Sequence, residues 1–198
     1  MSRKDNEKKE TKPKKTEETS IGREIWEYVK MIAIVVAVVV FVEQVIVINA
    51  RIPSPSMENT IMTGDQIFGN RLSYVKSDPQ RYDIVIFYYP DDEKQKFIKR
   101  VIGLPGETVQ IMEDGSIYIN GEKLEESYGR EVIQPETIGR AAEPIVLGED
   151  EYFVMGDNRN NSSDSRTDIV GNIKREDIIG KAWLRIWPLS DFGVLKHQ

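Results

Sequence analysis

A long apolar stretch near the N-terminus constrains this chain more than any other feature. Residues 31–42 carry no polar side chain, and residues 45–48 extend the stretch beyond Glu43 and Gln44. A membrane-spanning helix needs about 20 mostly apolar residues. We therefore predict one transmembrane anchor helix over residues 26–48.

Two other structures fit an apolar stretch of this kind. Valine and isoleucine favour β-strands, but the stretch is longer than an ordinary strand. A cleavable secretory signal would end near Ala50, but Ile48 is large for its position just before such a cut. A retained anchor is the preferred interpretation.

The charges on either side of the span predict its orientation. Residues 1–30 contain nine Lys and Arg, whereas Arg51 is the only cation close to the other end. The positive-inside rule then places residues 1–25, a charged tail without hydrophobic periodicity, in the cytoplasm. Residues 49–191 form the extracytoplasmic domain and residues 192–198 a short C-terminal tail. The expected location is the cell membrane, with the lipid bilayer as a partner.

Composition excludes several classes of protein. The chain has no cysteine, so a thiol nucleophile, a thiolate metal site and a disulfide are all excluded. The only histidine, His197, lies in a terminus that we expect to fray. A serine hydrolase built from this chain therefore needs a lysine as its base. Residues 31–198 carry a net charge of −8, which argues against a nucleic-acid partner.

Short strand-like segments separated by turn residues fill the exported part. They are residues 83–89, 97–102, 108–112, 116–119, 151–155 and 180–187. Asn120-Gly121 is a strong hairpin signal, and residues 122–145 look like a polar surface excursion. We predict a mostly β domain with a coiled, antiparallel, barrel-like sheet.

Two serines separated by one proline are candidates for nucleophilic chemistry. Pro53 and Pro55 flank Ser54, and Ser56 follows. Proline pushes the preceding residue towards an extended conformation, so Ser54 and Ser56 should lie on one side of the segment. One hydroxyl can then attack a carbonyl while the other donates a hydrogen bond to the oxyanion. A Pro/Ser linker leaving the membrane is the alternative.

Lys99 is the candidate base. In an extended strand it shares a face with the apolar Phe97 and Val101, and burial there would lower the pKa of its amine. The alternative is a lysine at a strand edge that points to water. Arg100 points to the other face and can pair with an acid such as Asp164.

The polar loop 156–166 follows a strand and can supply a hydroxyl that orients the lysine. It does not fit a calcium-binding EF-hand, since Arg159 takes the third ligand position and no glycine takes the sixth. We therefore expect no metal and no cofactor. A second Ser-x-x-Lys, at Ser73 and Lys76, lacks the other elements of penicillin-binding enzymes and is interpreted as chance.

Four motif blocks, in order along the chain, carry a resemblance to a known family. They are Ser54-Pro55-Ser56-Met57, Gly64-Asp65, residues 99–107 (Lys-Arg-Val-Ile-Gly-Leu-Pro-Gly-Glu) and residues 156–166. In this order they resemble the motifs of bacterial type I signal peptidases, and the likeness covers nearly all of residues 22–190. The resemblance implies a coiled antiparallel β fold. A single predicted span resembles the Gram-positive form.

The resemblance also implies roles for individual residues. Ser56 would be the nucleophile and Lys99 the general base, with Ser54 and Ser56 forming the oxyanion hole. Residues that would orient the lysine or brace the site are Ser162, Asp164, Arg166 and Arg100. Candidate walls of the substrate pocket are Ile52, Pro53, Met57, Ile61, Ile86 and Ile98.

The function implied is removal of signal peptides from exported preproteins, at sites with small residues at positions −1 and −3. The protein-export translocon would be a further partner. Two positions depart from the family pattern. Pro55 replaces the usual glycine or aspartate, and Asn59 replaces proline, which should loosen the following turn. The rival function is a membrane-tethered β domain that binds exported peptides without cutting them; a buried Lys99 within reach of Ser56 would favour the enzyme.

Overall fold

The structure is a computed structural model that describes residues 21–90 and 92–197. Most of the predicted cytoplasmic tail, residues 1–20, lies outside the described residues. Helix α1 (Ile21–Val45) is the one helix among the described residues that is long and apolar enough to cross a membrane, with a mean hydropathy of 2.3 over its most apolar window. None of its side chains is buried, as expected for a helix whose environment is lipid.

The helix starts and ends earlier than the predicted span of residues 26–48. The difference at the C-terminal end has a packing cause. Val47 and Ile48 belong to a strand, β1 (Val47–Arg51), and the Ile48 side chain is buried in the core of the domain. The apolar residues at the end of the stretch therefore belong to the β domain and not to the anchor.

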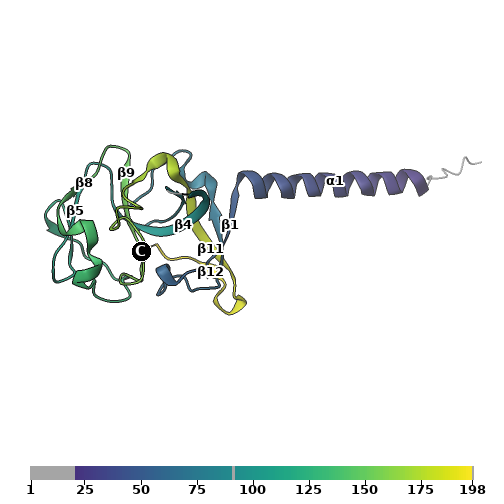
Figure 1. Cartoon of the computed structure of the whole chain (residues 1–198). Helices are drawn as coiled ribbons and strands as arrows, with labels where there is room; N and C mark the ends of the chain where they lie inside the picture. The colour runs from purple at the N-terminus through teal and green to yellow at the C-terminus, as the bar shows by residue number, and fades with distance from the viewer. Residues whose placement is uncertain (1–20, 91, 198) are drawn as a thin grey trace, which may run out of the picture. The chain divides into compact units, whose positions relative to one another are not determined.

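The β domain contains two antiparallel sheets (Figure 1). The large sheet has the order β1, β2 (Gln66–Asn70), β11 (Ile178–Trp187), β3 (Ile84–Tyr89), β4 (Asp92–Gly103), β9 (Glu151–Met155) and β10 (Ile173–Lys174), with β12 (Gly193–Val194) paired to β11. The small sheet has the order β7 (Glu122–Lys123), β6 (Ile117–Ile119), β5 (Thr108–Ile111) and β8 (Ile145–Val146). Six short 3₁₀ helices connect them: η1 (Pro55–Met57), η2 (Arg71–Tyr74), η3 (Pro135–Thr137), η4 (Gly139–Ala142), η5 (Arg175–Asp177) and η6 (Leu189–Asp191).

The mostly β, antiparallel fold predicted from the sequence is confirmed. The barrel-like closure is not, because β1 and β10 are free edges of the large sheet and neither sheet closes on itself. Strand β3 shows why the large sheet is stable. Ile84 and Ile86 pack on one face while Val85 and Phe87 pack on the other, and all four are fully buried.

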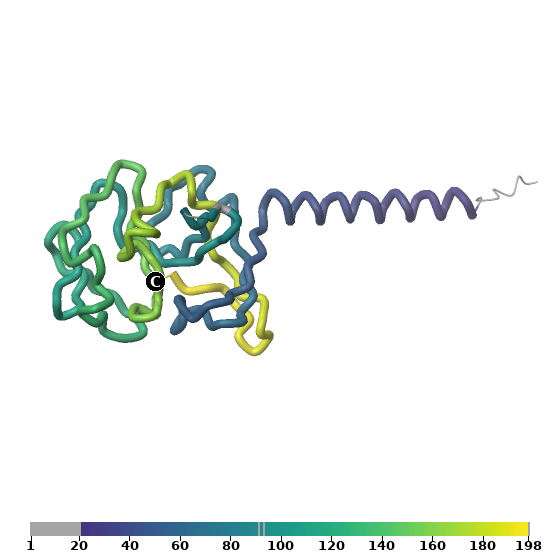
Figure 2. The backbone as a smooth tube through the Cα atoms, in the orientation of Figure 1, coloured from purple at the N-terminus to yellow at the C-terminus, as the bar shows by residue number. Residues whose placement is uncertain are grey.

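Residues 122–145 are more than the surface excursion that their polarity suggests. Ile133, Ile138 and Ala141 join a core cluster with residues of the small sheet, and Phe153 of β9 closes this cluster from the large sheet. In Figure 2 this green part of the chain lies together on one side of the β domain, while the blue and yellow parts, which include β2 and β11, lie on the other.

The C-terminal segment is bound to the sheet, contrary to the prediction that it frays. Strand β12 pairs with β11, and the Leu195 side chain is buried. The backbone N–H of Ile84 donates a hydrogen bond to Nδ1 of His197 at 3.0 Å. Burial, reinforced by the charge of Lys181, lowers the pKa of His197 to about 4. His197 is therefore a neutral structural acceptor.

Candidate active site

A short turn positions the two candidate serines. Ser54 is extended, with φ −130° and ψ 156°, as its place before Pro55 predicts. Helix η1 begins at Pro55 and puts Ser56 in a turn rather than in a continued extended segment. The turn brings the Oγ atoms of Ser54 and Ser56 to 3.5 Å. The predicted proximity of the hydroxyls is present, but the turn produces it and not the two-residue repeat of a strand.

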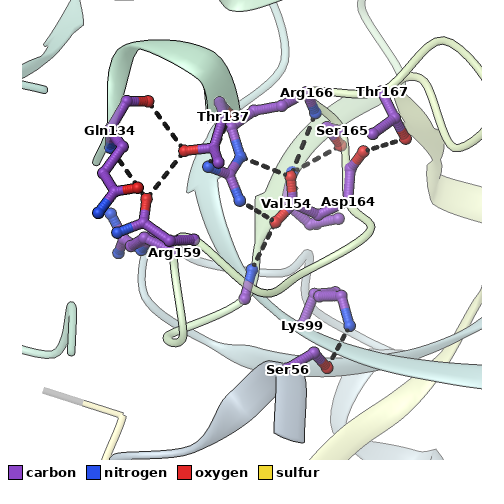
Figure 3. Close-up of polar contacts among 12 residues, drawn as sticks. Ser56, Lys99, Gln134, Thr137, Val154, Arg159, Asp164, Ser165, Arg166 and Thr167 are labelled. Carbon is purple, nitrogen blue, oxygen red and sulfur yellow. Dashed lines mark hydrogen bonds and ion pairs between the residues drawn. The ribbon is translucent and has the colours of Figure 1, made fainter. Parts of the chain in front are cut away.

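Strand β4 carries Lys99 to this turn. The Lys99 side chain is only 4% exposed. Its Nζ atom donates a hydrogen bond to Ser56 Oγ at 2.8 Å (Figure 3). It also donates to the Ile98 carbonyl oxygen at 3.2 Å. Nζ also lies 5.2 Å from the centre of the Phe97 ring. Lys99 therefore points to Ser56 and not to water.

Burial of Lys99 makes its amine a usable base. Loss of hydration lowers the pKa of Lys99 to about 8, although the carboxylates of Asp164 and Asp157 act in the opposite direction. An amine with this pKa is partly neutral in mildly alkaline solution. Its lone pair can then accept the proton of a hydroxyl that lies within hydrogen-bond distance.

The polar loop 156–166 holds the serine turn in place. Asn158 donates from its backbone N–H to the Ser56 carbonyl oxygen and from Nδ2 to the Pro55 carbonyl oxygen, both at 3.1 Å. A Cβ atom on Gly156 would lie 2.3 Å from the Ser56 carbonyl oxygen, so only glycine allows the loop to approach this closely. The sequence shows the Gly156-Asp157-Asn158 motif, but it does not show that this motif contacts the backbone of the serine turn.

Asp164 and Arg166 fix the conformation of the same loop. Arg166 donates from Nε and Nη2 to the two carboxylate oxygens of Asp164, each at 2.8 Å, and both residues are buried (Figure 3). Gly156 N–H also donates to Asp164 at 3.0 Å. Burial would raise the pKa of Asp164, but the hydrogen bonds and charge of Arg166 outweigh it and keep that pKa below the ordinary value.

Ser162 lines the same groove as Ser56 and Lys99, but no hydrogen bond joins its hydroxyl to either of them among the described residues. Its buried Oγ atom instead interacts with the Asp164 carboxylate and contributes to the lowered pKa of that group. A Cβ atom on Gly156 would lie 2.3 Å from this hydroxyl, which places it against the strand end that leads into the loop. Its role in orienting Lys99 stays a prediction.

Arg100 pairs with a different acid from the one suggested by the sequence. Its Nε and Nη2 atoms donate to the two carboxylate oxygens of Asp157 at 2.8 and 2.7 Å, and both side chains are almost fully buried. Asp164 is not available because Arg166 occupies it. Thr60 Oγ1 also donates to Asp157 at 2.5 Å. This ion pair therefore joins β4, the polar loop and the segment after the serine turn.

Asn59 does not loosen its turn, as had been expected from the absence of proline. It adopts φ 100°, and its Nδ2 atom donates to the Tyr128 carbonyl oxygen at 2.9 Å. Proline is held near φ −65° and could not adopt this backbone. Asparagine tolerates positive φ better than most residues, and here it also ties the turn to a neighbouring segment.

A groove of about 910 Å³ opens beside Ser56 and Lys99. Four of the six predicted pocket residues line it, namely Ile52, Pro53, Met57 and Ile98. Ile61 and Ile86 are fully buried in the core cluster beneath and are not among the described residues that line the groove. Sequence position does not separate a groove wall from the core that supports it, and a role of Ile61 and Ile86 in substrate binding stays a prediction.

Comparison with known proteins places the chain in a family. Residues 25–187 match the family described as signal peptidase, peptidase S26. Signal peptidase I of Leptolyngbya laminosa is 37% identical over 86% of this chain and 84% of that protein, and signal peptidase I of Bacillus amyloliquefaciens is 33% identical over 91% of this chain and 97% of that protein. The chain belongs to this family of peptidases, and the resemblance seen in its motifs is confirmed.

Two further matches have shorter coverage. Probable signal peptidase I-2 of Synechocystis is 40% identical over 73% of this chain, and the matched part is 65% of that protein, just under two thirds of its length. A crystal structure of a signal peptidase I from Enterococcus faecalis V583 is 38% identical, with a TM-score of 0.44, and the match covers 53% of this chain and 97% of that one.

Proposed function

We propose that this chain removes signal peptides from exported preproteins, with Ser56 as nucleophile and Lys99 as general base. The observation that carries the proposal is the 2.8 Å hydrogen bond between Lys99 Nζ and Ser56 Oγ in a site where Lys99 is almost fully buried. Family membership supports the substrate class. The same burial disfavours a binding domain without catalysis, because a buried lysine that only binds peptides would incur a desolvation cost with no function.

The proposed reaction has two stages. Neutral Lys99 accepts the proton of Ser56 Oγ as this oxygen attacks the carbonyl carbon of the scissile bond. The oxyanion accepts hydrogen bonds from Ser54 Oγ and from the Ser56 backbone N–H. The Lys99 ammonium then protonates the leaving amine, which releases the mature protein. Lys99 then deprotonates a water that attacks the acyl-enzyme carbonyl carbon. As the acyl–oxygen bond breaks, the Lys99 ammonium returns this proton to Ser56 Oγ, which frees the signal peptide and regenerates the enzyme.

The proposal extends to specificity and location. Ile52, Met57 and Ile98 bring apolar surface to the groove next to the dyad, which suits small side chains at substrate positions −1 and −3. We assign the tail that precedes helix α1 to the cytoplasm, helix α1 to the bilayer and residues 49–191 to the outside, with the translocon as the source of substrate. Cleavage of a model preprotein by the purified full-length chain tests the function directly.

The oxyanion role of Ser54 predicts a partial loss of activity. Ser54→Ala should lower kcat by about 10²- to 10³-fold, the usual effect of removing one oxyanion donor, with little change in KM. The side chain is exposed, so thermal unfolding should not change. Steady-state kinetics on the model preprotein provides the measurement, and Ser73→Ala is a matched control on a serine outside the groove. A Ser54→Ala enzyme with wild-type kcat would remove Ser54 from the oxyanion hole.

The proposed topology predicts which positions a membrane-impermeant thiol reagent can reach in intact cells. The chain has no cysteine, so single cysteines give no background. Cysteine at the exposed positions Arg51 and Lys76 should be labelled, and cysteine at Thr11 only after permeabilisation. Ser56 is eleven residues beyond the end of α1, which reaches at most about 40 Å. Labelling of position 11 in intact cells, or protection of position 76, would reverse the topology.

A further inference from the structure

The groove beside Ser56 has an unusual charge. Besides Lys99, three exposed cationic side chains line it: Arg51 from β1, and Lys94 and Lys96 from β4. No aspartate or glutamate is among the described residues that line the groove. This contrasts with the net charge of −8 carried by residues 31–198. The groove is thus a locally cationic channel in an acidic protein.

The strand directions place these cations on one side of the dyad. Each neighbouring pair along β1, β2, β11, β3 and β4 is antiparallel, so β1 and β4 run in the same direction. Both lead towards the site, β1 to Ser56 and β4 to Lys99. Lys96 and Lys94 precede Lys99 by three and five residues, and Arg51 precedes Ser56 by five. Along the regular part of β4, at about 3.3 Å per residue, Lys96 lies roughly 10 Å before Lys99. Arg51 and Lys94 are separated from Ser56 and Lys99 by five residues each, which span at most about 18 Å.

The membrane anchor indicates which part of a substrate meets them. Strand β1 begins two residues after α1 ends, so Arg51 is the groove cation that follows the anchor most closely in the chain. In the proposed function the apolar part of the signal peptide is also in the membrane, upstream of the cut. An extended substrate then places residues about three to five positions before the scissile bond beside these cations. The proposed function requires a small residue at position −3. Positions −4 and −5 are therefore the ones that can carry a charged side chain beside the cations.

We propose that this channel selects signal peptides that carry a carboxylate at position −4 or −5 and disfavours those with a cation there. The inference rests on the proposed function and names a further element of its specificity. Arg51 can bind a carboxylate through two parallel hydrogen bonds, while Lys94 and Lys96 act as point charges. At the hairpin turn before these lysines, the Asp92 side chain accepts hydrogen bonds from the Lys94 backbone N–H and from the Gln95 side chain.

The test uses three model preproteins that differ only at position −5, with Glu, Gln or Lys. They are cleaved by the full-length chain in neutral detergent. Each exposed charge pair changes affinity by up to about fivefold, so kcat/KM for the Glu substrate should exceed that for the Lys substrate by about tenfold. The difference should appear in KM, with kcat unchanged, and should shrink at 0.5 M salt because such pairs are screened.

Variants assign the preference to the groove. In the triple variant Arg51→Gln, Lys94→Gln, Lys96→Gln the ratio between Glu and Lys substrates should fall to about one. Lys76→Gln removes an exposed lysine outside the groove and should keep both the ratio and the turnover of the Gln substrate. Cleavage of the Gln substrate, and its loss in Ser56→Ala, tests the proposed function separately. The specificity proposal can therefore fail while the enzyme assignment stands.

Two outcomes would overturn the specificity proposal. One is equal KM values for the three substrates with the wild-type chain. The other is a triple variant that still prefers the Glu substrate over the Lys substrate to the same extent as the wild-type chain, which would give the preference another origin.

Discussion

Replacement of Ser56 with alanine should abolish cleavage of a model preprotein. Removal of a catalytic nucleophile costs on the order of 10⁶ in kcat, so product should fall to the detection limit of a gel or mass-spectrometric assay. The fold should survive, because the change deletes one oxygen from a turn that Asn158 holds through the Pro55 and Ser56 carbonyls. Lys99 keeps its hydrogen bond to the Ile98 carbonyl. Circular dichroism and the melting temperature check this point.

Three matched serine variants separate the roles. Ser54→Ala should lose part of the activity, Ser162→Ala should raise the pH needed for activity if its hydroxyl helps to orient the amine, and Ser73→Ala should behave as wild type. A Ser56→Ala protein that cuts at the wild-type rate would refute the nucleophile assignment. If neither the Ser56→Ala protein nor the wild type cuts the preprotein, and the wild type binds it, the chain is a binding domain.

Replacement of Lys99 with arginine should be as damaging as loss of the nucleophile, although the charge is kept. A guanidinium has a pKa above 12 and cannot accept a proton from serine near neutral pH. It is also larger and planar, in a site where Lys99 is 4% exposed. Lys99→Met retains the length without charge and is the control for packing. Activity in the arginine variant would exclude Lys99 as the base.

The same residue predicts the pH dependence of the wild-type enzyme. Burial lowers the pKa of Lys99 to about 8, and only the neutral amine can act as base. Thus kcat/KM should rise about tenfold per pH unit below pH 8 and level off above it. The profile of kcat/KM between pH 5 and 10 measures this limb. A limb near the ordinary lysine pKa of about 10.4 would mean that Lys99 is solvated in the free enzyme.

Local patterns predicted much of the fold. The alternating apolar strands appear where expected, because β3 and β4 have apolar side chains for both buried faces. The anchor boundary was wrong because Val47 and Ile48 are as suitable for a membrane helix as for a buried strand. The C-terminal strand β12 was missed because its two residues are too few to show the alternation of apolar and polar side chains that is typical of a strand. Its pairing depends on where β11 lies.

For the candidate site, the sequence indicated residue types better than it indicated partners. The geometry of Ser56 and Lys99 agrees with the motif interpretation, and their chemical roles await the variants above. The pairing of Arg100 with Asp157 could not be derived, since Asp157 and Asp164 sit in one polar loop and only the folded loop decides which arginine each meets. The positive φ of Asn59 likewise depends on a contact with Tyr128, far along the chain.

The clamp of Asn158 on the serine turn has a consequence for the timing of activity during biosynthesis. The turn and its clamp are 103 residues apart in the chain, and the buried pair of Arg100 and Asp157 spans 57. Contacts between such distant residues form late in folding, because the intervening chain must first be ordered. In the topology proposed above, a nascent chain that has delivered Ser56 and Lys99 across the membrane, but not yet the loop after β9, lacks the clamp. The proposed catalytic site would then be incomplete until most of the β domain has been translocated.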